Sequence, residues 1–307
     1  MEDFKHYTVM KNEAVDALNC RDGLIYVDCT LGGGGHSELI LSSISPNGRL
    51  IAFDVDDDAI NAASERLKGY KNLTIVKDSY ANIKQVMKNL GIEKITGGVL
   101  FDLGASYHQL TKAERGFSFS KEAPLDMRFN QDSDFSAYDV VNGYSESDLV
   151  RIFSEYGEER FSKRIAKAIV EQRNKKKIET TTELADLIVK CTPKIKSAIH
   201  PATRVFQAIR IEVNGELQNV KNTLNDVLDL LDIGAIISVI SFHSLEDRVV
   251  KHLFKYHSQR CHCNDMICKC PPPKLELVNK KPIMASEEEI KINPPSRSAK
   301  LRIAKRV

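Results

Sequence analysis

Apolar and polar positions in the first third of the chain alternate between two patterns. Short apolar runs predict strands, and they occupy residues 24–27, 49–53, 73–76 and 98–101. Segments with apolar residues at helical spacing predict helices, and they occupy residues 12–18, 37–42, 59–67 and 83–90. Strands that alternate with helices are typical of a parallel sheet covered on both faces. The sequence therefore predicts an α/β fold with a Rossmann-like, doubly wound sheet.

The alternation stops after residue 102. Residues 112–130 are irregular, and two helices follow. Ser145 can cap the first helix, and Thr180 with Glu183 forms a capping box for the second. A β-branched run at residues 235–240 then resumes the buried sheet, with a helix from Leu245. We therefore expect a discontinuous sheet domain of residues 1–111 and 206–307, and an inserted helical domain of residues 112–205.

The first predicted strand leads into four consecutive glycines, Gly32 to Gly35, and then into a helix. Glycines allow positive φ and a close approach of the backbone to a ligand, and the helix start offers unpaired N–H groups. A nucleotide-like ligand is one interpretation of this loop. A glycine-rich connection without a ligand is the other.

Each of the four predicted strands is followed by an aspartate, namely Asp28, Asp54, Asp78 and Asp102. Asp54 has the position of a ribose-binding carboxylate in doubly wound folds. It could instead cap the next helix, but Asp56, Asp57 or Asp58 can do that, so the ligand role is favoured. A rim of carboxylates would repel a pyrophosphate, and the G-x-G-x-x-G spacing is absent. A nucleoside that carries a sulfonium or an amine fits better.

The 307 residues are 42% hydrophobic and 28% charged, as in an ordinary globular protein. Residues 1–10 lack a signal-peptide core, and the apolar run near residues 234–242 is too short to span a bilayer, so we expect a cytoplasmic protein without a membrane partner. The seven cysteines are an odd number, and three are scattered, which argues against a disulfide framework. The net charge is only +2, but basic residues cluster at 160–177 and 297–306.

Two segments of the inserted domain are candidates for contact with nucleic acid. Residues 112–130 combine Phe117, Phe119 and Phe129 with Arg115 and Arg128, which could stack on and grip a nucleotide, or simply pack as a surface loop. A basic surface follows, made of Arg160, Lys163, Arg164, Lys167, Arg173 and residues 175–177. It is either a solvated helix face or a phosphate-binding surface.

Two further features stay open on the sequence alone. His243 follows the strand at 235–240 and either lines the ligand site or is a hydrogen-bonded structural histidine. Cys261, Cys263, Cys268 and Cys270 form two C-x-C pairs, which could bind zinc, although the usual spacing is C-x-x-C. Free thiols are favoured over zinc, so no metal is expected.

Several long motifs are similar to those of the ribosomal small-subunit RNA cytosine-N4 methyltransferase family, the MraW/RsmH type. They lie at residues 28–37, 102–106 with Gln109, 114–119, 124–128, 156–160, 200–204, 241–248 and 297–304. The resemblance extends over essentially the whole chain. The sequence departs from the family pattern at Tyr107-His108, where Ser-Pro is more usual, and at Thr111, where an Asp is common.

The resemblance implies a class I S-adenosyl-L-methionine-dependent methyltransferase fold with an inserted α-helical domain that recognises RNA. The implied substrate is the N4 amino group of a cytidine in 16S rRNA of the small ribosomal subunit. The implied cofactor-binding residues, matched motif by motif, are Gly34, Gly35, His36, Asp54, Tyr80, Asp102 and Gln109. Whether the chain acts as a monomer or a homodimer is left open.

Asp102 is the expected catalytic residue. The N4 lone pair of cytidine is delocalised into the ring, and an acceptor on N4–H would localise it and take up developing positive charge. We expect Asp102 to orient the amine rather than act as a strong base. A methyltransferase for a protein or small molecule, and a catalytically silent RNA-binding factor, are the alternatives.

Overall fold

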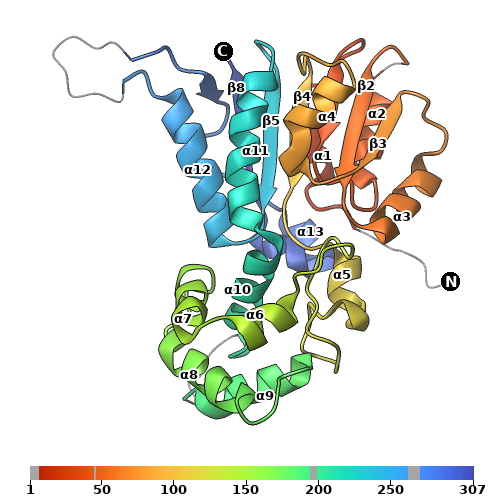
Figure 1. The fold of residues 1–307 in the computed structure, drawn as a ribbon. Helices are drawn as coiled ribbons and strands as arrows, with labels where there is room; N and C mark the ends of the chain where they lie inside the picture. The colour runs from red at the N-terminus through yellow and green to blue at the C-terminus, as the bar shows by residue number, and fades with distance from the viewer. Residues whose placement is uncertain (1–6, 45, 194–198, 262–269) are drawn as a thin grey trace. The chain divides into compact units, whose positions relative to one another are not determined.

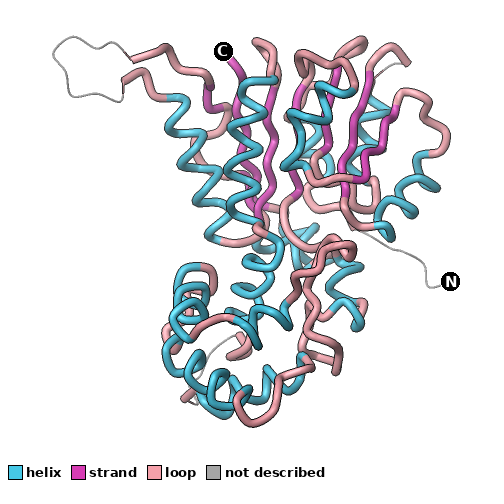
Figure 2. Tube along the Cα trace, in the orientation of Figure 1, coloured by secondary structure: helices cyan, strands magenta, loops and turns pink. Residues whose placement is uncertain are grey.

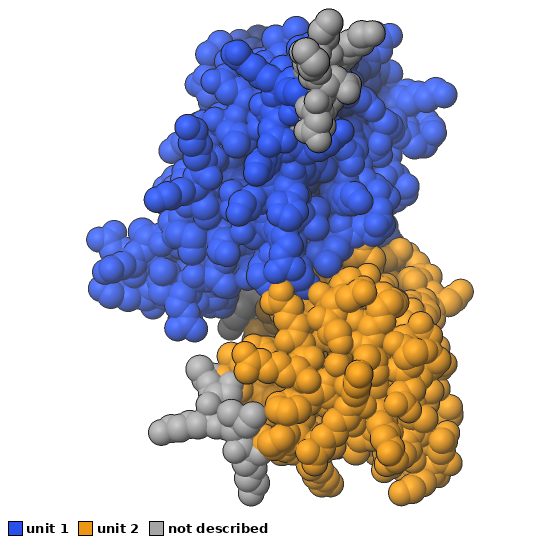
Figure 3. Space-filling model, turned by 90° about the vertical axis from the view of Figure 1, so that its left-hand side faces the viewer, with its two compact units in different colours: residues 1–104, 217–307 blue, residues 105–216 orange. Residues whose placement is uncertain are grey.

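The computed structural model describes residues 7–44, 46–193, 199–261 and 270–307. The chain divides into two compact units (Figure 3). Unit 1 comprises residues 1–104 and 217–307, and unit 2 comprises residues 105–216. The boundaries expected from the sequence, at 111/112 and 205/206, lie inside unit 2. They differ because helix α10 (Thr203–Asn214) supplies Phe206, Ala208 and Ile209 to the core of unit 2.

Unit 1 is built on one eight-stranded sheet (Figures 1 and 2). Its strands are β1 (Ile25–Asp28), β2 (Arg49–Asp54), β3 (Leu73–Lys77), β4 (Gly98–Asp102), β5 (Ile236–Ser241), β6 (Leu275–Leu277), β7 (Ile283–Met284) and β8 (Lys300–Arg306). The order is β3-β2-β1-β4-β5-β8-β6, and β7 also pairs with β8. Strands β1 to β5 are parallel, whereas β8 is antiparallel to its partners. The predicted α/β sheet is therefore confirmed.

Helices cover both faces of this sheet. They are α1 (Lys11–Asp16), α2 (Gly35–Ser43), α3 (Asp57–Leu67), α4 (Ile83–Asn89), α11 (Glu216–Leu230), α12 (Ser244–Ser258) and α13 (Glu287–Ile292). Alternate strand residues point to opposite faces. Val27 and Val99 pack in a core with α4, α11 and α12, whereas Tyr26 and Leu100 pack in a second core with α1, α2 and α3. Burial on both faces explains why the parallel strands are continuously apolar.

The antiparallel strand β8 is a feature that the sequence analysis did not predict. Its residues 301–304 are all buried, and Ile240 of β5 pairs with Leu301. The basic residues Lys300, Arg302, Lys305 and Arg306 interrupt the apolar pattern, so the segment does not look like an interior strand. Only its sheet neighbours explain its burial.

Unit 2 is helical and has its own core. Its helices are α5 (Tyr107–Thr111), α6 (Ala137–Gly143), α7 (Glu146–Glu155), α8 (Ser162–Arg173), α9 (Thr181–Cys191) and α10. Ser145 caps α7 by accepting a hydrogen bond from Asp148 N at 3.1 Å. Thr180 and Glu183 form the capping box of α9. Both predicted helix starts are confirmed.

The irregular segment before α6 packs against unit 2 itself. Phe117 stacks on Phe129 with ring centroids 5.5 Å apart, and Phe119 stacks on His200 at 4.6 Å. Arg115 is 1% exposed and donates to the carbonyls of Arg128 and Phe129. These side chains therefore have the role of a packed loop, the second of the two interpretations given above.

None of the helices in the described part of the chain is both long enough and apolar enough to cross a bilayer.

Candidate active site at the carboxyl ends of the parallel strands

Three of the predicted aspartates lie at the carboxyl ends of neighbouring strands. Asp28 ends the central strand β1, Asp54 ends β2 and Asp102 ends β4. The glycine loop connects β1 to α2 and starts from the same edge of the sheet. Parallel strands direct such residues to one edge, which is where doubly wound sheets bind ligands.

Asp28 and Asp54 hold the glycine loop from two sides. Asp28 is fully buried and accepts hydrogen bonds from Ser37 Oγ at 2.7 Å and from the N–H of Thr30 at 3.0 Å. Asp54 accepts a hydrogen bond from the N–H of Gly32 at 2.8 Å. These contacts give both carboxylates a role in shaping the loop, which the spacing argument did not anticipate.

Asp56 is the N-cap of α3 and accepts a hydrogen bond from Asp58 N at 3.0 Å. The helix cap that Asp54 might have supplied is therefore provided by another residue. The other carboxylate oxygen of Asp54 accepts from the N–H groups of Val55 at 2.8 Å and Asp56 at 3.0 Å. Burial nevertheless raises the pKa of Asp54 above its ordinary value.

Gly34 and Gly35 are required by protein packing. Gly34 has a φ of 76°, and a Cβ there would lie 3.1 Å from a methyl carbon of Leu67. A Cβ on Gly35 would lie 1.8 Å from Thr8 Oγ1. Helix α2 begins at Gly35, so the N–H groups of its first turn have no acceptor within the helix. Contact of Gly34, Gly35 and His36 with a ligand would therefore be made by the backbone.

Asp102 differs from the other two aspartates because one of its oxygens is unsatisfied. Its Oδ1 is buried and has no hydrogen-bond partner among the described residues. Its Oδ2 lies 3.7 Å from His36 Nδ1, and its side chain is 17% exposed. The backbone N–H of Asp102 donates to Thr30 Oγ1 at 2.7 Å, which fixes the end of β4 beside the glycine loop. The partly exposed Asp102 carboxyl group therefore has hydrogen-bonding capacity that none of the described residues uses.

The imidazole of His36 is oriented by the backbone. It is 4% exposed, and its Nε2 lies 3.1 Å from the carbonyl oxygen of Val9. A carbonyl only accepts, so Nε2 carries the proton in this contact. The other nitrogen, Nδ1, then faces the Asp102 carboxylate.

The electrostatics of this edge favour a cation. Burial raises the pKa of Asp102 well above its ordinary value, and the nearby carboxylates of Asp28, Glu246 and Glu289 raise it further. A positively charged ligand beside these groups would lower that pKa and be attracted by the carboxylates. The residues therefore fit the sulfonium-bearing cofactor expected from the sequence.

Tyr80 begins a short 3-10 helix, η1 (Tyr80–Asn82), that follows β3. Its ring meets Phe101 edge to face, with centroids 5.8 Å apart. Asp78, the fourth strand-end aspartate, bonds only neighbouring residues among the contacts of the described chain. It accepts hydrogen bonds from Ser79 N at 2.7 Å and Asn82 Nδ2 at 2.8 Å.

Gln109 belongs to unit 2, where it completes the capping box of α5. Its Oε1 accepts from Ser106 N at 2.9 Å, and its N–H donates to Ser106 Oγ at 3.2 Å. The helix start is thus formed although Tyr107-His108 departs from the family pattern. The expected contact of Gln109 with the cofactor stays a prediction.

His243 has the role of a hydrogen-bonded structural histidine, one of the two alternatives considered for it. It is the N-cap of α12, and its Nδ1 accepts from Glu246 N at 3.4 Å. Its Nε2 lies 3.0 Å from Glu246 Oε1. Glu246 in turn accepts from the N–H of Phe242 at 2.8 Å.

The basic surface of unit 2 is partly structural. Arg173 donates to the carbonyls of Val141 and Tyr144, and Lys176 pairs with Glu183 at 2.8 Å. Four other basic residues are exposed, and their side chains make no hydrogen bond or ion pair within the described ranges. They are Arg160, Lys163, Arg164 and Lys175.

Of the four clustered cysteines, Cys263 and Cys268 lie outside the described residues. The zinc alternative therefore stays open.

The chain is similar in sequence to known proteins over almost its whole length. The model of the MraW methylase family matches residues 3–307. Ribosomal RNA small subunit methyltransferase H of Caldicellulosiruptor bescii is 53% identical, over 99% of this chain and 100% of that protein. The protein of the same name from Clostridium botulinum strain Loch Maree is 49% identical over the same shares. Among solved structures, an rRNA methylase from Streptococcus thermophilus has a TM-score of 0.43 and 12% identity, covering 96% of this chain and 95% of that one.

The burial of Asp28 predicts a measurable pH dependence of stability. Burial raises its pKa from 3.8 to about 6. A pKa raised by folding stabilises the folded state below the unfolded pKa, and this contribution is lost as the pH rises through the folded value. We expect Asp28→Asn to gain about 2 kcal/mol in unfolding free energy relative to wild type between pH 4 and pH 7. Denaturant unfolding of both proteins at pH 4 and pH 7 measures this. The prediction is contradicted if the difference in unfolding free energy between variant and wild type is the same at the two pH values.

Proposed function

Because the chain belongs to the MraW methylase family, we propose that it transfers a methyl group from S-adenosyl-L-methionine to the N4 amino group of a cytidine in 16S rRNA. The relatives named above supply the substrate class, because they are ribosomal RNA small subunit methyltransferases. The observation that carries the chemistry is the partly exposed, incompletely hydrogen-bonded carboxyl group of Asp102 beside the glycine loop. This substrate would place the reaction in the cytoplasm.

The cofactor would be held at the carboxyl edge of the sheet. The backbone of Gly35 and His36 offers N–H groups at the start of α2, next to Gly34, whose own N–H donates to Leu31 O at 2.8 Å. Asp54 ends β2, and Tyr80 follows β3. When bound, S-adenosyl-L-methionine supplies a methyl group that its sulfonium has already activated. The chain's main task is then to place the amine in line with that methyl group.

Asp102 would position and activate the amine. Its partly exposed carboxylate can accept a hydrogen bond from N4–H, which localises the nitrogen lone pair and stabilises the positive charge that develops on N4. Methylation leaves one proton in excess on the amine, and the Asp102 carboxylate can receive it. His36 Nδ1 lies 3.7 Å from Oδ2 and presents a lone pair there, since Nε2 carries the proton, so it favours the protonated state of that carboxyl group.

Unit 2 would bind the RNA backbone through helix α8 and its flanks. Arg160, Lys163 and Arg164 are exposed, and no described acid pairs with them. Unpaired surface cations of this kind bind phosphates and release counterions. The aromatic residues of the 112–130 segment are packed inside unit 2, so phosphate contact rather than base stacking is the role that this unit supports.

The modified nucleoside gives a direct test of the proposed reaction. We expect N4-methylcytidine in small-subunit RNA of cells that contain this protein and a lower amount after its gene is removed. Mass spectrometry of digested nucleosides measures the change, and re-expression should restore the methylated nucleoside. Unchanged N4-methylcytidine after removal would rule out this substrate.

Replacing Asp102 separates catalysis from binding. We expect Asp102→Asn to reduce the single-turnover rate by about 10²- to 10⁴-fold at saturating cofactor and RNA, because the amide cannot accept the released proton. The wild-type rate should rise with pH as the Asp102 carboxyl group ionises, and the variant should lack this rise. Asp78→Asn is the matched control, since Asp78 bonds only local groups among the described residues. Near-native turnover by Asp102→Asn would exclude the proposed role.

The RNA contact of α8 can be tested by removing charge from exposed residues. We expect Lys163→Gln with Arg164→Gln to weaken binding of a small-subunit RNA fragment and to lower the salt dependence of its affinity. Lys71→Gln with Lys88→Gln removes the same charge from exposed positions of unit 1 and should change neither. Fluorescence anisotropy over a salt series measures both, and equal behaviour of the two double variants would contradict the assignment.

A further inference from the structure

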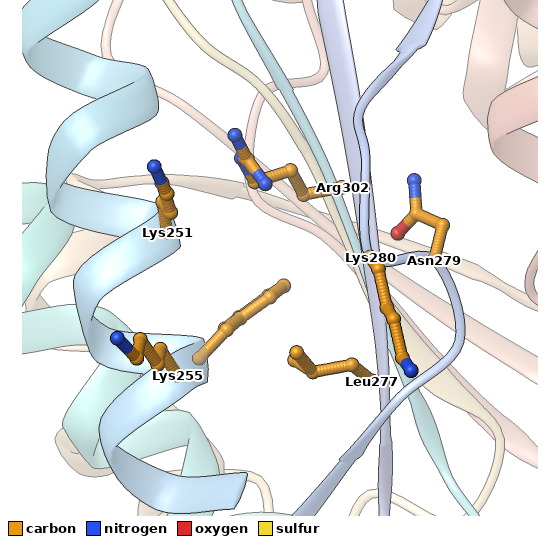
Figure 4. Close-up of a pocket in the computed structure, with 7 residues that line it drawn as sticks. Lys251, Lys255, Leu277, Asn279, Lys280 and Arg302 are labelled. Atoms are coloured by element: carbon orange, nitrogen blue, oxygen red, sulfur yellow. The ribbon is translucent and has the colours of Figure 1, made fainter.

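Unit 1 contains a basic pocket between α12 and the C-terminal strands (Figure 4). Its volume is about 100 Å³. The lining residues are Lys251, Phe254, Lys255, Leu277, Asn279, Lys280 and Arg302. Lys251 and Lys255 come from α12, and Lys280 and Asn279 face them from the segment after β6, with Arg302 of β8 between (Figure 4). Four cationic side chains thus line the pocket, with the amino groups of Lys255 and Lys280 directed away from its centre (Figure 4), and no carboxylate is among the lining residues.

The charge of this pocket is not neutralised by neighbouring acids. Lys251, Lys255 and Lys280 are exposed, and their side chains make no ion pair or hydrogen bond within the described ranges. Arg302 is 8% exposed and is held by Asp247, with Nε 2.6 Å from Oδ1 and a terminal nitrogen 3.3 Å from Oδ2. Lys300 lies 3.6 Å from the same carboxylate. Asp247 is therefore already offset by two cations, and the three lysines give the pocket a net positive charge.

The pocket is also preformed. Asn279 donates through Nδ2 to the carbonyl of Leu301 at 2.9 Å and accepts from the N–H of Ile303 at 2.7 Å. These bonds fix the segment after β6 onto β8. Phe254 is 2% exposed and forms the floor with Leu277, so no open aromatic face is available for a base to stack on. A small anion fits these walls better than a nucleobase does.

We propose that this pocket binds a phosphodiester group of the substrate RNA, as an anchor separate from the methylation site. The inference rests on the proposed function. Helix α12 starts at Ser244, just after the carboxyl end of β5. A rise of 1.5 Å per residue places Lys251 and Lys255 about 10 and 16 Å along the helix. An RNA strand whose target base lies at the carboxyl ends of the parallel strands would reach the pocket within a few nucleotides. Such a contact fixes register and carries no sequence information.

The test removes the three lysines together, as Lys251→Gln, Lys255→Gln and Lys280→Gln. The probe is a labelled small-subunit rRNA fragment that contains the target cytidine, titrated over a salt series. We expect about tenfold weaker binding at 0.1 M salt. The plot of the logarithm of the binding constant against the logarithm of the salt concentration should have a slope that is smaller in magnitude by about one. Calorimetry should give unchanged binding of S-adenosylhomocysteine, because the lysines lie outside the cofactor site.

The matched control is Lys68→Gln, Lys71→Gln and Lys88→Gln, which removes three exposed lysines elsewhere on unit 1. Equal RNA affinity and slope for the two triple variants would overturn the proposal. Loss of binding to whole small subunits without loss on the RNA fragment would also overturn it, because the partner would then be a protein. Wild-type methylation of the fragment is measured in the same series. If wild type binds and methylates it while the pocket variant behaves as the control, only the pocket assignment fails.

Discussion

The geometry of the site depends on buried carboxylates that accept hydrogen bonds from the glycine loop. Asp28 fixes Thr30 and Ser37, and Asp54 fixes Gly32. A carboxylate buried without partners is strongly unfavourable, and these hydrogen bonds offset much of that cost. Asp102 is the exception, since one of its oxygens is left unsatisfied. The same residue type therefore has two roles: two aspartates build the loop, and the third is available for chemistry.

The clustered carboxyl groups lower the stability of the ligand-free protein and favour the binding of a cation. Asp28, Asp102, Glu246 and Glu289 are close enough for their charges to raise the pKa of Asp102. Without a cation nearby, the Asp102 carboxyl group resists ionisation, so charging it in the ligand-free site costs free energy. A bound cation relieves that cost, and part of the affinity for the cofactor comes from this relief. Unsatisfied polar groups and clustered like charges are common at functional sites for this reason.

The sequence predicted the parallel strands, the helix caps of unit 2 and the gathering of aspartates, because each depends on local periodicity or on strand ends. It did not predict strand β8, whose burial comes from its sheet neighbours, nor the loop-shaping contact of Asp54 with Gly32. The open alternatives for His243 and for the 112–130 segment also needed tertiary contacts to resolve them. Arg173 looked like a phosphate ligand, but it binds carbonyls at the end of α6. Residue type alone does not distinguish a cation that binds RNA from one that binds the protein's own backbone.

The insertion of unit 2 has a consequence for how the sheet forms. Strands β4 and β5 pair from Gly98 with Ile236 to Asp102 with Ile240, although all of residues 105–216 lie between them in sequence. Pairing over such a separation is slow, because a long loop must close before any contact is gained. During synthesis, β4 therefore has an unpaired edge until residues 236–241 have left the ribosome. The nascent sheet passes through a stage with an exposed apolar edge, and the rate of translation through unit 2 sets how long that stage lasts.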